Sequence, residues 1–100
     1  SAVIDTDVYE VLTLDGSVKV ELVVNDESIR LQAQDALIEL KQTGGSDGQV
    51  RLEVGQAKAT FKQNGDISIE TTGNLTLKGN KVEISGDTQV KIAGTAVQLN

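Results

Sequence analysis

Apolar and polar residues alternate in short runs along most of the chain. The C-terminal third repeats one three-residue unit, apolar then polar then apolar, five times. Strict alternation places both apolar side chains on one face of a strand and the polar side chain on the other, so each unit predicts one short β-strand. The units are Ile67-Ser68-Ile69, Leu75-Thr76-Leu77, Val82-Glu83-Ile84, Val90-Lys91-Ile92 and Val97-Gln98-Leu99.

The units recur at a nearly constant spacing. They start at residues 67, 75, 82, 90 and 97, so the repeat length alternates between 8 and 7 residues. Gly65, Gly73, Gly79, Gly86 and Gly94 precede them, usually beside Asn, Asp or Thr, and these are turn-forming residues. The repeat therefore predicts a short strand followed by a tight turn.

The same alternation continues upstream and brings the expected number of strands to about ten. A helix over residues 29–41 is the weaker alternative, because Arg30, Gln32 and Glu39 all fall on the outward phase of a strand. The pattern predicts an all-β chain. The upstream segments are Val18–Leu22, Ile29–Ala33, Ile38–Leu40, Val50–Val54 and Ala57–Phe61.

Three regions differ in the regularity of this pattern. Residues 1–17 carry apolar positions in mixed phase and are expected to form a lead-in. Residues 18–49 contain longer strands and end in the glycine loop 44–48, and residues 50–100 carry the regular repeat.

A strand of two or three inward residues, about 7 to 10 Å long, is not stable alone. The repeat is also too short for one chain to complete a three-sided coil. We therefore expect an intertwined homotrimeric triple-stranded β-helix, or triangular β-prism, in which three parallel copies share one core.

The inward residues of the regular region are the predicted trimer core, and the outward residues Ser68, Thr76, Glu83, Lys91 and Gln98 are expected to form a solvated surface. The predicted core consists of Val50, Leu52, Val54, Phe61, Ile67, Ile69, Leu75, Leu77, Val82, Ile84, Val90, Ile92, Val97 and Leu99.

Composition agrees with a thin interior. Val, Leu and Ile supply 29 of the 38 apolar residues, and Tyr9 and Phe61 are the two aromatic residues. The chain contains no His and no Cys, which excludes the usual nucleophile triads, zinc sites and disulfides. We expect no cofactor and no enzymatic activity.

The net charge of −6 is concentrated in residues 1–50, which carry −7, while residues 51–100 carry +1. A chain without a basic cluster cannot neutralise phosphates, so nucleic acid is not an expected partner. An anionic membrane would repel it for the same reason. It contains no apolar run long enough to span a bilayer.

Two carboxylate pairs, Asp5 with Asp7 and Asp26 with Glu27, are candidate calcium ligands. Solvated acids at turns explain them more simply. The run 44–50 contains glycines and one Asp as calcium-binding nonapeptide repeats do, but it occurs once and in the wrong order. We expect a plain loop there and no metal site.

Asn74-Leu75-Thr76 has the form of a glycosylation sequon, but Leu75 is inward in this register, so the match is treated as chance. Alternation with two alanines places Phe61 inward, as a core filler and not a surface anchor. Tyr9 lies in the least patterned region and is left open.

The run from Gly65 to Gly86 resembles the C-terminal β-helix of VgrG spike proteins of type VI secretion systems and of related contractile phage tail spikes. The resemblance covers residues 50–100 and, more loosely, 18–49. It implies a trimeric, membrane-puncturing needle at the front of a tube that sheath contraction drives forward. It also implies assembly in the bacterial cytoplasm and delivery into the target envelope, or a place in a virion tail.

Members of this family carry N-terminal domains that dock on the tube and baseplate, so the resemblance implies that the chain is a fragment. Some phage spikes hold an iron ion with His-x-His at the tip, which a chain without His cannot do. The family alternative is a blunt end capped by a PAAR-repeat protein. The expected cap platform is Thr95, Ala96, Val97, Gln98, Leu99 and Asn100.

Three other interpretations stay open. The chain could be a phage or pyocin-like tail spike, which these residues do not distinguish from a secretion spike. It could be a monomeric β-solenoid that binds a ligand or ice, although its outward residues do not form rows of one type. It could also be an adhesion or carbohydrate-binding sandwich, a class that favours longer strands and exposed aromatic residues.

Overall fold

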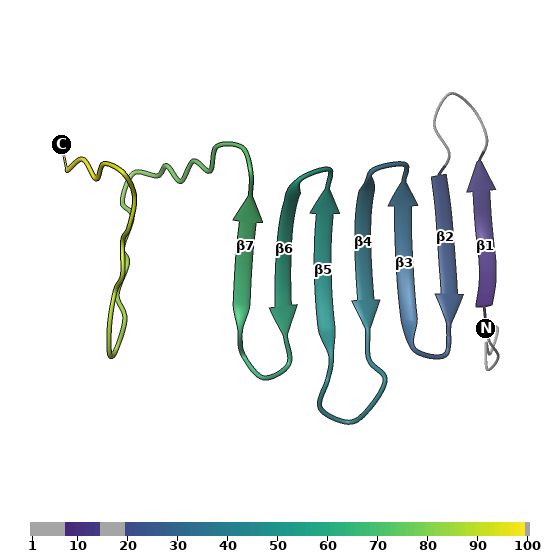
Figure 1. The fold of residues 1–100 in the computed structure, drawn as a ribbon. Helices are drawn as coiled ribbons and strands as arrows, with labels where there is room; N and C mark the ends of the chain where they lie inside the picture. The colour runs from purple at the N-terminus through teal and green to yellow at the C-terminus, as the bar shows by residue number, and fades with distance from the viewer. Residues whose placement is uncertain (1–7, 15–19, 100) are drawn as a thin grey trace.

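The structure is a computed structural model, and it describes residues 8–14 and 20–99. They form one seven-stranded antiparallel sheet in which every strand pairs with the next along the chain (Figure 1). No helix occurs in these residues, so none of them could cross a membrane as a helix. The strands are β1 (Val8–Leu14), β2 (Val20–Asn25), β3 (Ser28–Ala33), β4 (Ala36–Lys41), β5 (Gln49–Val54), β6 (Ala57–Lys62) and β7 (Ile67–Thr71).

The prediction of an all-β chain is confirmed, and the alternative of a helix over residues 29–41 is wrong. That segment forms β3 and β4, joined by the two-residue turn Gln34–Asp35. Gln34 has φ of 53°, a left-handed conformation that begins the turn. The outward Arg30 and Glu39 are directly paired across the two strands.

The pairing within the sheet differs from the intertwined arrangement expected from the sequence. Strands β1 to β7 pair inside one chain, whereas we predicted that backbone groups pair between parallel copies throughout. The turns explain the difference. A two-residue connection such as Gly55–Gln56, where Gly55 has φ of 55°, joins antiparallel neighbours, and parallel neighbours need a crossover of about a dozen residues.

Strand β1 lies in the region that the sequence pattern left unassigned. Its register with β2 shifts between Glu10 and Leu12, which is the mark of a β-bulge. An extra residue reverses the inward and outward phase halfway along a strand, and this accounts for the mixed phase of the segment.

The register aligns the residues on one face of β2 to β7, all apolar except Thr71, into three rows that cross the sheet. We call this the apolar face. The large row is Val24, Ile29, Leu40, Val50, Phe61 and Ile67; the middle row is Leu22, Leu31, Ile38, Leu52, Ala59 and Ile69; the small row is Val20, Ala33, Ala36, Val54, Ala57 and Thr71.

Residues 72–99, which we call the tail, contain no strand. The chain bends at 72–73, 80–81, 87–88 and 94–95, and the last four predicted units lie between or after these bends. The repeat of 7 to 8 residues is therefore present in the backbone. No part of residues 74–99 forms a strand or a backbone hydrogen bond with the described chain, so the last four predicted units are not strands within one copy, where no neighbouring strand pairs with them.

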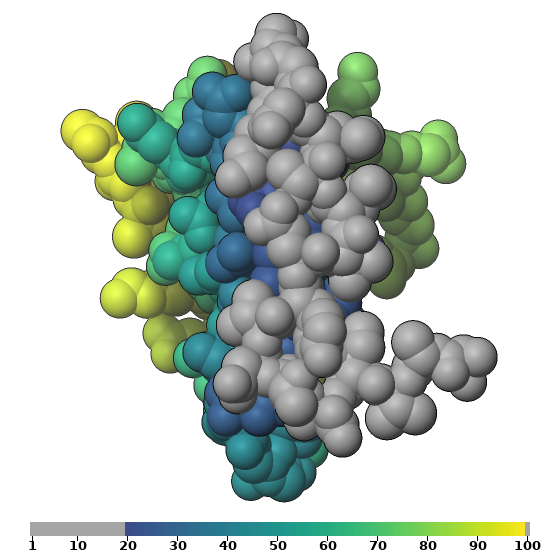
Figure 2. Space-filling model, turned by 90° about the vertical axis from the view of Figure 1, so that its right-hand side faces the viewer, coloured from purple at the N-terminus to yellow at the C-terminus, as the bar shows by residue number. Residues whose placement is uncertain are grey.

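The tail extends beyond β7 (Figure 1) and, viewed from the side of β1, projects to both sides of the narrow sheet (Figure 2). Gly86 begins one of its bends. A Cβ atom there would lie 2.2 Å from the carbonyl oxygen of Gln89, so only glycine fits.

Candidate assembly interface

The two faces of the sheet show an inverted pattern of burial. In β5 the apolar Val50, Leu52 and Val54 are 37%, 42% and 60% exposed. Their polar neighbours Arg51 and Glu53 are half-buried. In a folded domain the apolar side chains of such a strand normally face the core. Here the single chain covers its charged face and leaves its apolar face bare.

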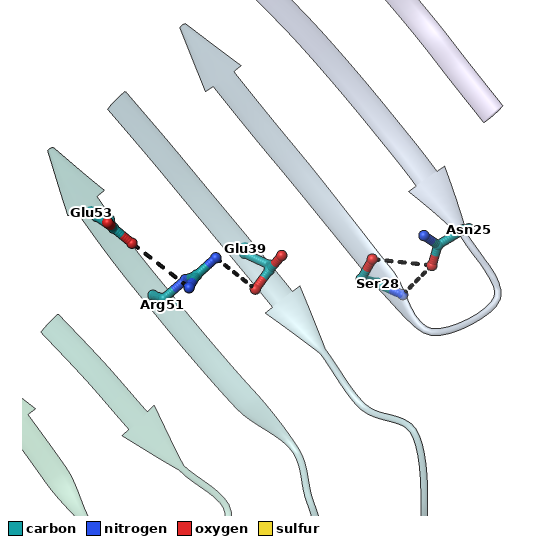
Figure 3. Close-up of polar contacts among 5 residues, drawn as sticks. All are labelled: Asn25, Ser28, Glu39, Arg51 and Glu53. Carbon is teal, nitrogen blue, oxygen red and sulfur yellow. Dashed lines mark hydrogen bonds and ion pairs between the residues drawn. The ribbon is translucent and has the colours of Figure 1, made fainter. Parts of the chain in front are cut away.

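The charged face covers itself with its own long side chains. Arg51 lies between two acids from β4 and β5, with Nη2 3.3 Å from Glu39 Oε1 and Nη1 3.7 Å from Glu53 Oε2 (Figure 3). The Glu39 side chain is only 16% exposed. Lys58 Nζ lies 3.9 Å from Glu70 Oε2 one strand pair further on. Each such pair contributes little to stability, about 0 to 1 kcal/mol, but together they place aliphatic stems flat on the sheet.

The position of the core confirms this inversion. Among residues 20–99, Val23 is the one apolar side chain that is buried, and it keeps 8% exposure. It lies on the charged face, in register with Arg30 of β3. The apolar face contributes nothing to a buried core within a single copy.

The exposed area of the chain supports the same conclusion. Its accessible surface is 8611 Å², whereas a compact monomer of 10.6 kDa exposes about 5,500 Å². Its radius of gyration is 18.3 Å, against about 13 Å for a compact domain of 100 residues. The excess of roughly 3,000 Å² per chain is the size of an obligate protein interface.

The structure places the predicted core residues in two groups. Val50, Leu52, Val54, Phe61, Ile67 and Ile69 lie together on the apolar face, each at least 37% exposed. The remaining eight lie in the tail at 50% to 86% exposure. Sequence reasoning did not assign Leu22, Val24, Ile29, Leu31, Ile38 and Leu40 to this surface, although their alternation carried the same signal.

Backbone groups of residues 74–99 form no hydrogen bond with other backbone groups of the described chain. Each non-proline residue carries one N–H and one C=O that must bond to protein or water. When the alternating apolar side chains of such a segment are buried, the backbone groups beside them also lose contact with water. If the apolar side chains of the tail are buried, the surface that covers them has to supply backbone hydrogen bonds as well, as another β-strand does.

The expected cap platform lies at the end of the tail. Thr95 is in the last bend, Ala96 to Leu99 follow it, and Leu99 is 86% exposed. Asn100 lies outside the described residues. The structure brings these residues together only as consecutive positions of one segment.

The loop 42–48 is a closed polar structure. The Asp47 carboxylate accepts hydrogen bonds from the backbone N–H of Thr43 (3.0 Å) and Gly44 (2.8 Å) and from the Thr43 hydroxyl. The Thr43 hydroxyl and these amides hold the pKa of Asp47 below its ordinary value of 3.8. Gln63 Oε1 accepts a hydrogen bond from the backbone N–H of Gly48 at 2.8 Å. The Asp is thus satisfied by its own loop.

The other candidate sites are not formed by the residues that the structure describes. Asp26 and Glu27 occupy the turn between β2 and β3, where Asn25 Oδ1 accepts bonds from Ser28 N–H (2.7 Å) and Ser28 Oγ (3.0 Å) (Figure 3). Asp5 and Asp7 lie outside the described residues. Within residues 8–14 and 20–99 no three potential metal ligands gather. The side chain of Tyr9, in β1, is likewise not described.

Leu75 of the sequon is 59% exposed in the tail, and Phe61 sits on the apolar face between Val50 and Ile67.

Comparison of the chain with protein-family models, with curated proteins and with solved structures gave no match.

Proposed function

We propose that this chain forms the shaft of a homotrimeric spike at the tip of a contractile injection machine. In this proposal β1 to β7 of each copy form one side of a triangular prism, with the three apolar faces turned inward. The tails of the three copies then wind into a triple-stranded β-helix that continues the prism. The chain has a mechanical role and no catalytic one.

The bare apolar face carries this proposal. Its three rows run across every strand from β2 to β7, so a cover must match the whole sheet. A second sheet is the usual cover, but the described residues form one sheet only. The sandwich is therefore not completed by one copy, and two further copies supply the missing surfaces.

The tail supports a threefold arrangement independently. Its repeat of 7 to 8 residues returns the chain to the same phase after each bend, as a corner of a prism requires. Each straight segment is too short to fold alone, and it gains backbone partners from the copies on either side. The stacking of strands along the axis carries a compressive load through backbone hydrogen bonds, which suits a puncturing device.

The partners follow from this role. The shaft joins tube and baseplate proteins through further N-terminal domains, meets the target membrane mechanically, and carries a PAAR-type cap on the platform at residues 95–100. A type VI secretion spike assembles in the bacterial cytoplasm and leaves it on firing. A phage or pyocin-like tail spike is the alternative within the same architecture, and it differs in the machine and not in the shaft.

Sedimentation equilibrium tests the proposal, together with sedimentation velocity. We expect a particle of three times the 10.6 kDa chain mass with high friction. Leu52→Asp in the middle row should break the trimer, because it places a charge in a dry core. Thr60→Asp, which places a charge on the opposite face of the sheet and in register with Arg51, should leave the trimer intact.

A compact monomer of 10.6 kDa would contradict the proposal and favour the solenoid interpretation. For the cap, Leu99→Asp should weaken binding of a PAAR-repeat protein to a trimer of unchanged mass and circular dichroism. Equal binding by this variant would remove the platform from the proposal.

A further inference from the structure

We propose that the apolar face closes on further copies of this chain through one kind of seam, in which the small row of one copy packs against the large row of the next. The inference rests on the proposed trimer and specifies its contact. The partner is a second copy of this chain, and the contact is head-to-tail around the axis and not a self-complementary pairing.

The two outer rows differ in size on the same strands. At one end of β3, β4 and β6 stand Ala33, Ala36 and Ala57. At the other end of these strands stand Ile29, Leu40 and Phe61, which fill much more space. Because the strands alternate in direction, these three alanines lie along one edge of the face, and Ile29, Leu40 and Phe61 lie along the other.

The connections between strands also differ in length between the two edges of the face. The small row lies beside the two-residue turns Gln34–Asp35 and Gly55–Gln56. The large row lies beside the longer connections 42–48 and 63–66 and beside one two-residue turn, Asp26–Glu27. The longer connections from β4 to β7 thus stand at the large-row edge, and the compact turns of the same strands leave the small-row edge more open to a neighbouring sheet.

Exposure within one strand supports an opening at the small row. Val50 and Val54 are the same residue type at opposite ends of β5. Val54, in the small row, is 60% exposed, and Val50, in the large row, is 37% exposed. On β5 the small-row edge is therefore the more open of the two edges, and there it can receive the bulk of another copy's large row.

Cyclic symmetry joins these two edges. When three identical sheets stand around one axis, each corner brings one edge of a copy to the opposite edge of its neighbour. The middle row then faces the axis and the outer rows meet at the corners. A twofold pairing of two sheets would bring only two copies together and could not build a ring of three.

Disulfide cross-linking tests the seam cleanly, because the chain has no native cysteine. We pair Val50→Cys in the large row with a small-row cysteine on the same or an adjacent strand, in the variants V50C/V54C, V50C/A36C and V50C/A57C. Residues four apart along a strand lie about 13 Å apart, beyond the limit of about 7 Å for a disulfide. Any disulfide formed must therefore join two copies.

The matched control is Q49C/E53C, which has the same spacing on the same strand but on the charged face. Each variant is sized by sedimentation equilibrium with reductant, then oxidised and run on a non-reducing denaturing gel. We expect a covalent species of three chain masses for at least one of the three test pairs, and none for the control.

A reduced trimer in which none of the three pairs forms a covalent trimer overturns the seam and leaves the proposed function standing. Covalent species that stop at two chains in a particle of two chain masses overturn both, since they indicate a twofold contact. A monomer in the wild-type chain overturns the proposed function and with it the seam.

Discussion

Single residues of this chain are held mainly by short-range polar contacts at turns, because a single copy has almost no core. Asn25 caps the turn before β3 with its side-chain oxygen, and Asp47 closes the loop between β4 and β5 in the same manner. Asn and Asp side chains stabilise turns by accepting bonds from backbone amides ahead of them. Local order is therefore independent of whatever covers the apolar face.

The pKa of Asp47 reports on this local order. Since it is lowered from 3.8, the ionised loop contributes stability that is present above pH 3.8 and is lost as the pH falls through the folded-state pKa. Thr43→Ala removes the hydroxyl donor, the largest cause of the shift, so the pKa should rise toward 3.8. Carboxyl chemical shifts in an NMR titration measure this. A pKa unchanged by the substitution would contradict the assigned cause.

Gly86 is a second residue whose chemistry is fixed by the fold. Gly86→Ala would force a Cβ atom against the Gln89 carbonyl and move the backbone of the bend. We expect a loss of about 1 to 3 kcal/mol per chain in the free energy of unfolding, measured by urea denaturation. Gly79→Ala is the control, because its Cβ atom would lie 3.4 Å from the nearest atom. Equal losses in the two variants would show that the bend is not the cause.

At the scale of the element, strand positions from β2 to β7 follow from alternation alone, and their partners do not. Predicted strands such as Ala57–Phe61 agree with the observed β6 (Ala57–Lys62) within a residue or two. The antiparallel meander was missed although Gly55–Gln56 and Asn64-Gly65 are typical hairpin turns. The regular spacing of the units predicts stacked parallel copies, whereas these turn types predict antiparallel neighbours within one chain.

Alternation predicts which residues belong to the candidate interface, but it does not predict their order across the sheet. Alternation identifies which residues share a face, so Leu52 and Phe61 were assigned to it from the sequence. The order of residues across that face depends on register, which turns and bulges set. The bulge in β1 and the division into large and small rows could therefore not be derived from alternation.

The rows make a prediction about pairs of residues on one strand. Ala57→Phe should overpack the seam and Phe61→Ala should leave a cavity in it, each destabilising the trimer by about 1 to 5 kcal/mol. In the seam, the double variant moves the bulk from one edge to the other and should recover about 0.5 to 3 kcal/mol. Urea denaturation of the four proteins measures this coupling.

Residues 57 and 61 lie about 13 Å apart within a chain, and at such distances effects normally add. Coupling would thus report a contact between copies. The control pairs Ala57→Phe with Lys62→Ala on the charged face, and additive effects are expected there. Additivity in both pairs would contradict the contact.

At the scale of the whole molecule, the proposed trimer makes folding and assembly one process. In it the apolar face and the tail both gain their stabilisation from other copies, so unfolding exposes surface in three chains together. Such objects unfold slowly, and their stability is expressed as a rate as much as an equilibrium. The strands on either side of the glycine loop 44–48 pair with each other in the same sheet, and strand pairing within the chain ends at Thr71.

The midpoint of thermal unfolding should therefore rise with chain concentration. For three chains that separate on unfolding, each tenfold increase in concentration stabilises the trimer by about 2.7 kcal/mol. Calorimetry at two concentrations and at several scan rates measures the shift and separates it from kinetic effects. A midpoint independent of concentration at slow scan rates would indicate that each chain folds alone.

The bare apolar face also has a consequence for biosynthesis. A newly made chain leaves the ribosome with three rows of aliphatic side chains uncovered and an open strand edge at β7, and such surfaces aggregate readily. Ribosomes that follow one another along a single messenger hold sister chains close together at high local concentration. For the proposed trimer, production from that shared messenger, or protection by a chaperone, would therefore raise the share of chains that assemble before they aggregate.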